Sequence, residues 1–596
     1  MKVDYRVIGL IIIVLGALFF PGLPSTVQMG DTGELVRSAY AFEVPHPPGY
    51  PLFTYLNAAA IKLIPQGTVF WRASALTSVF AIGCCVLLLL MFTENVVLGF
   101  LLVLTLATSR LFWRFAVLPD VFALHSLIVA VILLIYLNPK FKKFEMYIPM
   151  LFLIGLSHHL TLVFVAPIIV HVGLRHIRNS KMWIAAGLGF VFTFGAYALL
   201  SFLNPENLDS WGQLTNTKAI LSHFLRSDYG TFKLVGTSES GSFLVLLNHL
   251  LTQTIKSFGF LILASLPLIY LRSVKYKSFP LKECLVAASI VLYISIFFYL
   301  SNTTLDGFRK ETFERFFIFF HVMFSFWLCN HFIAWKTSRR NYLLAGIVLT
   351  VGIVYNVANF YKLNNFSENT IIEDYAINLL NQTEDKKTSV LLAMTDTRYG
   401  ALKYAQTVLG VRKDVLVIHP RLLFFSWYLK KIPSRGLSLD SDKIINTNQL
   451  VLEQDVIVRN LQEFTFLTHL NFTDAAKYKI EIVPLGRKLV RGSGIEFKAT
   501  NDALKLRATP ANIFDSAKDY NVFYDLWTDY GHYYYFLALA QVSTDPPAAL
   551  ATLQKLVELV PWHFAAHKKI CELQNTEASK CDEAQKKRKD VFFDYY

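Results

Sequence analysis

Long apolar runs separated by short polar gaps fill the chain from about residue 7 to residue 360. A helix needs about 20 mostly apolar residues to cross the hydrocarbon core of a bilayer. The short runs 146–157 and 159–174 meet at His158-His159, and they form either two spans joined by a turn or one long span. Counted as two, they give about eleven predicted spans, near residues 7–24, 70–92, 96–109, 120–137, 146–157, 159–174, 182–203, 248–271, 283–300, 315–334 and 341–360.

Basic residues cluster in the gaps between these runs, and their positions predict the orientation of the chain. Short loops rich in Lys and Arg face the cytoplasm. With a turn at His158-His159, the basic gaps all fall on one face; a single span over 146–174 would place them on both faces. We therefore expect the other face to be extracytoplasmic and to carry residues 31–51, 111–120, 204–248 and 301–314, and everything after about residue 361.

The region after about residue 361 has the pattern of a soluble domain. Apolar or β-branched runs at Thr388–Met394 and Asp414–Ile418 predict strands, and Tyr399–Leu409 between them predicts a helix. Beyond about residue 515 the pattern is helical, and Ala548–Ala565 resembles a tetratricopeptide-type hairpin in which Pro561 ends one helix. The predicted fold is mostly α: a multi-pass helical membrane domain over 1–362, an α/β domain over 363–514 and a helical, tetratricopeptide-like segment over 515–596.

Composition supports a membrane protein and argues against a nucleic-acid partner. Of the 596 residues, 54% are hydrophobic and 17% are charged, whereas soluble proteins have about 25% charged residues. The net charge of +14 lies in the short gaps between apolar runs rather than on one binding surface. The chain has six cysteines, of which Cys571 and Cys581 lie in a polar tail and could pair if that tail faces an oxidising compartment.

Two acids, Asp31 and Glu34, follow the first apolar run directly. Their i, i+3 spacing matches a capping box in which Asp31 caps a helix that begins at Thr32. An acid near the bilayer boundary costs desolvation energy and usually has a function, and a capping Asp can also act as a base. The sequence from His46 to Pro51 is stiff because proline restricts its own φ and the preceding residue. It is either a helix-entry turn, with Pro51 in the first helical turn, or a support that holds His46 over a site.

Other polar residues on the expected outer face are candidates for binding an anionic substrate. Each also has an ordinary explanation: an interfacial aromatic belt, a surface turn, or a cation that extends to the lipid headgroups. The candidates are Arg114, His158, His159, Arg226, Asp228, Tyr229, Arg309 and Arg315. No HExxH, CxxC, P-loop or dinucleotide-binding pattern occurs in the sequence. We therefore expect no metal site and no required cofactor. A divalent metal is compatible with the sequence, but no motif indicates one.

Several motifs together resemble one family. They are Gly30-Asp31-Thr32-Gly33-Glu34, His46-Pro47-Pro48-Gly49-Tyr50-Pro51-Leu52-Phe53, Gly155-Leu156-Ser157-His158-His159, residues 224–232, Glu314-Arg315-Phe316, residues 410–415 and Trp427-Tyr428-Leu429. This combination is similar to the DUF2723 family, which includes the transmembrane protein 260 type of protein O-mannosyltransferase. The resemblance covers nearly the whole chain, and its Asp31 and His46 motifs are the most specific.

The resemblance implies a glycosyltransferase of the GT-C fold that uses a polyprenyl-phosphate-linked sugar, with mannose expected. Asp31 then matches the general base that removes the proton from a Ser or Thr hydroxyl of an acceptor protein, and Glu34 orients it or shares the work. Cationic groups should surround the leaving phosphate, and the candidates are His46, Arg114, His158, His159, Arg226, Arg309 and Arg315. One displacement step implies inversion at the anomeric carbon.

Three alternatives remain open from the sequence. The protein could be a multi-pass transporter, a GT-C transferase with a lipid or polysaccharide acceptor, or a scaffold whose C-terminal part recruits proteins. The expected location is a bacterial cytoplasmic membrane with the C-terminal domain outside the cytoplasm, or the endoplasmic reticulum membrane with a lumenal domain if the chain is eukaryotic.

Overall fold

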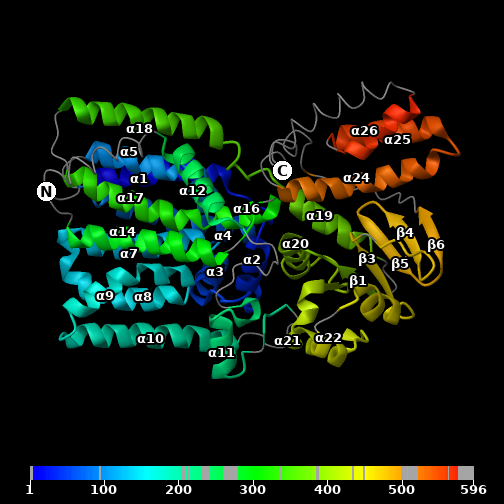
Figure 1. Ribbon diagram of the computed structural model, residues 1–596, viewed down its shortest axis with the longest axis horizontal. Helices are drawn as coiled ribbons and strands as arrows, with labels where there is room; N and C mark the ends of the chain where they lie inside the picture. The colour runs from blue at the N-terminus through cyan, green and yellow to red at the C-terminus, as the bar shows by residue number, and fades with distance from the viewer. Residues whose placement is uncertain are drawn as a thin grey trace. The chain divides into compact units, whose positions relative to one another are not determined.

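Tertiary contacts divide the chain into two units. The computed structural model describes residues 5–92, 96–202, 209–212, 214–230, 241–259, 280–301, 303–305, 307–334, 339–383, 388–432, 435–447, 450–470, 472–497, 507, 521–561 and 563–574. We call Met1–Ser25 with Ser38–Glu368 the helical unit, and Thr26–Arg37 with Asn369–Tyr596 the sheet unit. Figure 1 shows both.

This division departs from the predicted domains in the placement of one segment. Residues 26–37, which carry Asp31 and Glu34, pack with the C-terminal part of the chain instead of with the membrane helices. The predicted boundary near residue 515 lies outside the described residues, and α24, the helix that follows it and contains Asp529, contacts the α/β part. There Asp529 accepts a hydrogen bond from the Tyr375 hydroxyl (2.8 Å) and pairs with Arg398 (2.8 Å).

The helical unit consists of apolar helices packed against one another, with α4 on α7, α8 on α10, α17 on α7 and α5 on α18. In Figure 1 its long helices run roughly along one direction. Its first elements are α1 (Tyr5–Phe19), η1 (Phe20–Gly22), α3 (Pro51–Leu63), α4 (Val69–Leu89), α5 (Val96–Ala107), α6 (Arg110–Val117) and α7 (Phe122–Leu137). Pro51 is the first residue of α3, as predicted.

The second half of the helical unit contains more breaks than the first. Its elements are η2 (Pro139–Tyr147), α8 (Ile148–Leu156), η3 (Leu160–Val165), α9 (Ala166–Arg175), α10 (Ser180–Ser201), α11 (Thr217–Phe224), η4 (Ser227–Tyr229), α12 (Phe243–Phe258), α14 (Leu281–Leu292), η5 (Tyr293–Phe297), α15 (Phe298–Ser301), α16 (Gly307–Glu314), α17 (Phe317–Ala334) and α18 (Arg339–Phe360). Ser157, His158 and His159 interrupt the helix between α8 and η3, which confirms the break predicted there.

Among the described residues, six helices are long and apolar enough to cross a membrane, and two bent helix pairs raise this number to as many as eight. The prediction of about eleven is higher because it counted shorter runs separately: α7 continues into Pro139–Leu156 with a bend of 117°, and Leu160–Arg175 is a shorter apolar helix. The predicted span 248–271 lies partly outside the described residues. Helices α10 and α18 expose large apolar side chains, such as Leu188, Val191 and Val351. Such surfaces are stable against lipid rather than water, and the protein is an integral multi-pass membrane protein.

The sheet unit contains a six-stranded sheet of order β2-β1-β3-β5-β4-β6. Strands β1 (Thr388–Leu392) and β2 (Leu416–Ile418) are parallel and are joined through α20 (Asp396–Thr407), which confirms the predicted strand–helix–strand pattern. Strand β3 (Phe464–Thr468) is parallel to β1, β4 (Lys479–Val483) and β5 (Gly486–Val490) form an antiparallel pair, and β6 (Gly494–Phe497) is parallel to β4.

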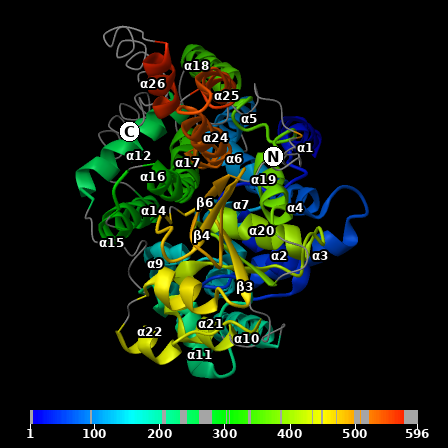
Figure 2. The ribbon, with the colours of Figure 1, turned by 90° about the vertical axis from the view of Figure 1, so that its right-hand side faces the viewer.

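Short helices connect these strands, and the C-terminal helices pack beside them (Figure 2). Helix α24 contacts β4 and α19, α25 packs against α24, and α26 packs against α25. Cys571 forms a disulfide, and its predicted partner Cys581 lies outside the described residues. The helices of this unit are α2 (Thr32–Ala41, shared with the helical unit), α19 (Ile371–Asn381), η6 (Pro420–Phe424), α21 (Ser426–Lys431), α22 (Ser441–Thr447), η8 (Leu452–Val458), α24 (Asn521–Gln541), α25 (Pro546–Leu559) and α26 (Phe564–Leu573).

The close packing of α10 on α8 leads to a stability prediction. A Cβ added at Gly189 would lie 2.8 Å from the carbonyl oxygen of Met150, whereas a Cβ at Gly187, on the same helix, meets nothing within 4 Å. We expect Gly189→Ala to cost about 1–3 kcal/mol because the two helices must separate. Gly187→Ala should leave the melting temperature in detergent unchanged or slightly raised. Equal melting temperatures for the two variants would contradict the packing of α10 on α8.

Candidate functional site

Three histidines gather inside the helical unit at the break between α8 and η3. His158 and His159 lie in the break, and His125 lies on α7. The ring centroids of His125 and His159 are 4.8 Å apart, and those of His125 and His158 are 6.3 Å apart. The ring of Tyr50, at the start of α3, lies 6.0 Å from His159 and 6.5 Å from His158. We call His125, His158, His159 and Tyr50 the histidine cluster.

Hydrogen bonds determine which ring nitrogen of these histidines carries a proton. The backbone N–H of Thr161 donates to Nδ1 of His159 (3.3 Å), so Nδ1 is an acceptor and the proton of the neutral ring is on Nε2. The Thr161 hydroxyl lies 2.7 Å from the same Nδ1 and 3.1 Å from Nε2 of His125, and it bridges the two rings. Nε2 of His158 donates to the carbonyl oxygen of Val121 (2.8 Å). His159 is therefore oriented to donate a hydrogen bond from Nε2.

Two of the predicted arginines, Arg226 and Arg315, interact electrostatically with His159. His159 is buried, and the charges of Arg226 and Arg315 act on its ring. The Arg315 guanidinium lies 5.8 Å from the ring centroid of Phe122 and 5.6 Å from that of Phe316. Both of these rings lie within about 6 Å of the His159 ring. The Arg315 guanidinium and the His159 ring thus share two aromatic neighbours, and a cation beside a hydrogen-bond donor is an arrangement that suits an anion.

His46 adjoins the histidine cluster through Tyr50. Its Nε2 lies 3.4 Å from the Tyr50 hydroxyl, and its ring centroid lies 6.3 Å from that of Trp211. His223 packs against Gly49, because a Cβ added at Gly49 would lie 2.9 Å from Nε2 of His223. Position 49, with φ +92°, therefore has no room for a side chain. Burial, together with the charge of His46, lowers the pKa of His223 to about 3. The stiff segment from His46 to Pro51 therefore places both His46 and Tyr50 at the site.

The segment that carries Arg226, Asp228 and Tyr229 reaches the same region through aromatic contacts. The Tyr229 ring lies 5.7 Å from that of Trp211, and the Arg226 guanidinium lies 5.4 Å from the Tyr229 ring. Asp228 is exposed in η4. Arg226 and Tyr229 are thus connected to His46 through Trp211.

Different contacts determine the positions of Arg114 and Arg309. Arg114 is buried on α6, and its guanidinium lies 5.5 Å from the ring of Phe115. Arg309 donates to the Thr304 hydroxyl over 2.6 Å. Both arginines remain candidates for the phosphate site.

Sequence reasoning did not single out His125, Thr161, Trp211 or His223. A signal existed for His125, because it is a polar residue within an apolar run, and such residues usually have a function. Thr161, Trp211 and His223 carry no comparable signal, since they join the site only through tertiary contacts.

The acidic pair belongs to the sheet unit. Helix α2 begins at Thr32, directly after Asp31, as the capping pattern predicts. The Thr32 hydroxyl donates to the carbonyl oxygens of Gln28 (2.9 Å) and Met29 (3.0 Å), which closes the turn before the helix. Asp31 and Glu34 are both partly exposed, so their carboxylates remain accessible from solvent.

The residues before Asp31 are anchored to the start of α19. The Thr26 hydroxyl and the Gln28 side-chain amide both donate to the carbonyl oxygen of Asn369, over 2.6 and 2.8 Å. The Val27 N–H donates to the carboxylate of Glu373 (3.4 Å). These bonds are the reason that residues 26–37 pack with the sheet unit.

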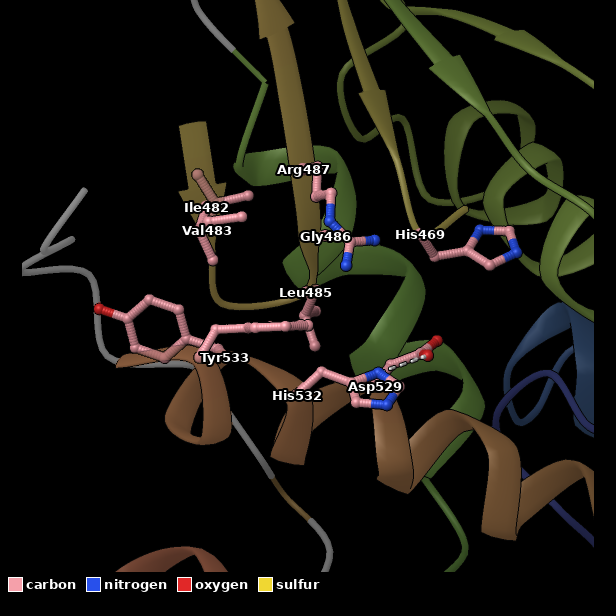
Figure 3. Close-up of a pocket in the computed structure, with 10 residues that line it drawn as sticks. His469, Ile482, Val483, Leu485, Gly486, Arg487, Asp529, His532 and Tyr533 are labelled. Atoms are coloured by element: carbon pink, nitrogen blue, oxygen red, sulfur yellow. Dashed lines mark ion pairs between the residues drawn. The ribbon is translucent and has the colours of Figure 1, made fainter. Parts of the chain in front are cut away.

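A separate pocket lies in the sheet unit between α24 and the β4–β5 hairpin (Figure 3). Its volume of about 30 Å³ holds a few water molecules and is too small for a sugar. Figure 3 shows the Arg487 guanidinium pointing toward Asp529 and His532. Nδ1 of His532 lies 3.9 Å from Oδ1 of Asp529. Within the described residues, no group of three or more His, Cys, Asp or Glu side chains is arranged to hold a metal ion.

Comparison with known proteins defines the class of this protein. Residues 31–183 match the family model described as the N-terminal domain of protein O-mannosyl-transferase TMEM260. The chain is 29% identical over 493 residues to the TMEM260 protein O-mannosyl-transferase of Mus musculus, covering 76% of this chain and 68% of the mouse protein. It is 26% identical over 463 residues to the corresponding Dictyostelium discoideum protein, covering 68% and 56% respectively. The protein is a membrane glycosyltransferase. More specifically, it is TMEM260-like, as its motifs indicate, and the expectation of an enzyme is confirmed.

Two solved structures of ArnT from Cupriavidus metallidurans are also similar. The one bound to undecaprenyl phosphate has a TM-score of 0.46 at 12% identity and covers 72% of this chain and 95% of ArnT. The apo structure has a TM-score of 0.49 at 11% identity and covers 82% and 98% respectively.

His419, on which the charge of Glu34 acts, leads to a pH prediction. Burial and the charge of Arg421 lower the pKa of His419 to about 4, although the negative charge of Glu34 opposes them. The unfolded chain, with a histidine pKa near 6.5, binds this proton more readily. Stability is therefore complete above about pH 6.5 and falls toward pH 4 by up to about 1.4 kcal/mol per pH unit.

The test compares the melting temperature at pH 7 and pH 5 for the wild type and His419→Asn. Asn keeps a side-chain acceptor for the Arg421 N–H, to which Nδ1 of His419 is bonded. The variant should lose less stability on acidification than the wild type. Identical losses would show that His419 does not contribute to the pH dependence.

Proposed function

We propose that this protein transfers mannose from a polyprenyl-phosphate donor to Ser or Thr hydroxyls of proteins outside the cytoplasm, with inversion at the anomeric carbon. The observation that carries this proposal is the group formed by the buried His159 and the partly exposed Arg315, which share the aromatic neighbours Phe122 and Phe316 in the helical unit. A lipid-borne phosphate requires cationic partners inside a membrane domain, and this group supplies them.

The leaving group determines what the helical unit must do. The bond between the anomeric carbon and the phosphate oxygen breaks, and the electron pair leaves with the polyprenyl phosphate. Preorganised positive charges stabilise the developing negative charge. Arg226 and Arg315 are assigned to the phosphate oxygens, with Nε2–H of His159 as a hydrogen-bond donor. His46 and His158 complete this binding site.

The acceptor hydroxyl must lose its proton as it attacks the anomeric carbon. We assign the Asp31 carboxylate as the base that takes this proton. Glu34 either orients Asp31 or shares this role. A positioned general base contributes roughly 10²–10⁴-fold to the rate. The match of the family model from residue 31 onward and the anchoring of the preceding residues support the assignment. The relatives' names support mannose and a protein acceptor.

Replacement of the base is the direct test of this mechanism. Asp31→Asn should reduce transfer from polyprenyl-phospho-mannose to a Ser/Thr peptide by roughly 10²–10⁴-fold, with an unchanged melting temperature. Asp414→Asn is a matched control, because Asp414 pairs with Arg412 on the surface, and it should keep full activity. Equal turnover in wild type and Asp31→Asn would exclude Asp31 as the base. Transfer to a lipid or polysaccharide but to no peptide would contradict the protein acceptor.

The Thr161 hydroxyl provides a test of the histidine cluster. Thr161→Val has nearly the same shape but loses the hydroxyl that bridges His125 and His159, so the orientation of His159 is less well determined. We expect kcat to fall about tenfold, in line with the loss of a partner that orients a functional histidine. Thr161→Ser restores the hydroxyl and should recover most of the rate. If Val and Ser variants are equally active, the bridge has no role in transfer.

A further inference from the structure

The first turn of α20 is held in an unusual backbone conformation. Thr395, the residue before the helix, has φ +75° and ψ 143°. A non-glycine residue at such a positive φ is strained, and strain of this kind persists only where the surroundings enforce it. The Thr395 hydroxyl accepts a hydrogen bond from the Arg398 N–H (3.4 Å) and so caps the helix. This turn sets the position of Thr397, which is buried two residues later.

Thr397 contacts the backbone next to Asp31. Its hydroxyl oxygen accepts a hydrogen bond from the Gly30 N–H over 3.0 Å. Gly30 has φ +72°, which glycine adopts without strain. The bond therefore fixes the chain one residue before Asp31, where the turn into α2 begins.

The same face of α20 contacts the chain on the other side of Asp31. A Cβ on Gly33 would lie 2.9 Å from the carbonyl carbon of Gly400, and a Cβ on Gly400 would lie 3.3 Å from the Glu34 nitrogen. The two backbones touch: a side chain at Gly33 has no room, and one at Gly400 would press on the Glu34 nitrogen. Thr397 and Gly400 are spaced i, i+3 and so lie on one face of the helix.

We propose that α20 of the sheet unit positions the Asp31 carboxylate for catalysis, with Thr397 and Gly400 as positioning residues on either side of it. This inference rests on the proposed role of Asp31. It makes the sheet unit part of the catalytic machinery, in contrast to a module that only recruits acceptor proteins. A base needs its carboxylate at a defined position, because small displacements of a reacting group reduce the rate strongly. Two contacts on one helix face, at Gly30 and Gly33 on either side of Asp31 and Thr32, meet this requirement.

The test uses a pair of Thr397 variants in the full-length protein. Thr397→Val removes the acceptor for the Gly30 N–H while it keeps the side-chain shape, and kcat should fall tenfold or more with an unchanged KM for polyprenyl-phospho-mannose. Thr397→Ser keeps the hydroxyl and should stay within about threefold of the wild type. Rates are normalised to the folded fraction. A rate for Thr397→Val within twofold of wild type, or a failure of Ser to rescue, would overturn the proposal.

Gly400→Ala is a second, independent change. The added methyl group presses on the Glu34 nitrogen, whereas the helix itself tolerates alanine better than glycine. We expect kcat to fall at least fivefold while the melting temperature is retained. Wild-type kcat in this variant would show that the contact between α20 and the acidic segment does not influence the carboxylate.

A double-mutant cycle separates this proposal from the proposed function. If Thr397 acts through Asp31, the double variant Asp31→Asn with Thr397→Val should be no slower than Asp31→Asn alone. Multiplicative losses would show that Thr397 acts independently of Asp31, and the positioning role would be excluded although Asp31 remained the base. If Asp31→Asn alone is fully active, the assignment of the base fails. The single variant shows this outcome before the double variant is measured.

Discussion

The arrangement of the helical unit depends on one constraint: polar groups buried among apolar helices must bond to one another. An unpaired polar group in such surroundings costs several kcal/mol. The break between α8 and η3 meets the constraint locally, because His158 donates to the Val121 carbonyl and Thr161 bridges His159 and His125. The Thr161 bridge holds the rings of His125 and His159 in defined orientations. For a phosphate that arrives from the lipid, such preorganisation is what a binding site requires.

The placement of the acidic segment changes the view of the C-terminal half of the chain. In the sequence, Asp31 and Glu34 follow the first membrane run and look like part of a membrane domain. In the structure, Thr26, Val27 and Gln28 bond to Asn369 and Glu373 at the start of α19, and Gly33 touches Gly400. The C-terminal part of the chain is thus in contact with the residues proposed to perform the chemistry. A purely recruiting tail would not need this connection.

Much of the fold was predictable because the signals are local. Apolar runs indicate membrane helices, Pro51 opens α3, and the pattern over residues 388–418 predicts β1, α20 and β2. The number of spans was less predictable, since bends such as the one of 117° after α7 join runs that look separate. The contacts of α24 were unpredictable for the same kind of reason: Asp529 joins Tyr375 and Arg398 from distant parts of the chain.

The sequence by itself indicated the class of protein and its apolar membrane helices, and most of the candidate residues were proposed from it. These properties follow from hydrophobicity, turn-forming residues and motifs, which act over a few positions. Only the tertiary structure decided that His125 and Thr161 contact His159 and that Trp211 connects Tyr229 to His46. It also decided that Asp31 packs within the sheet unit. Such contacts join residues up to several hundred positions apart, and no local pattern encodes which of the possible partners a buried hydrogen-bonding group will find.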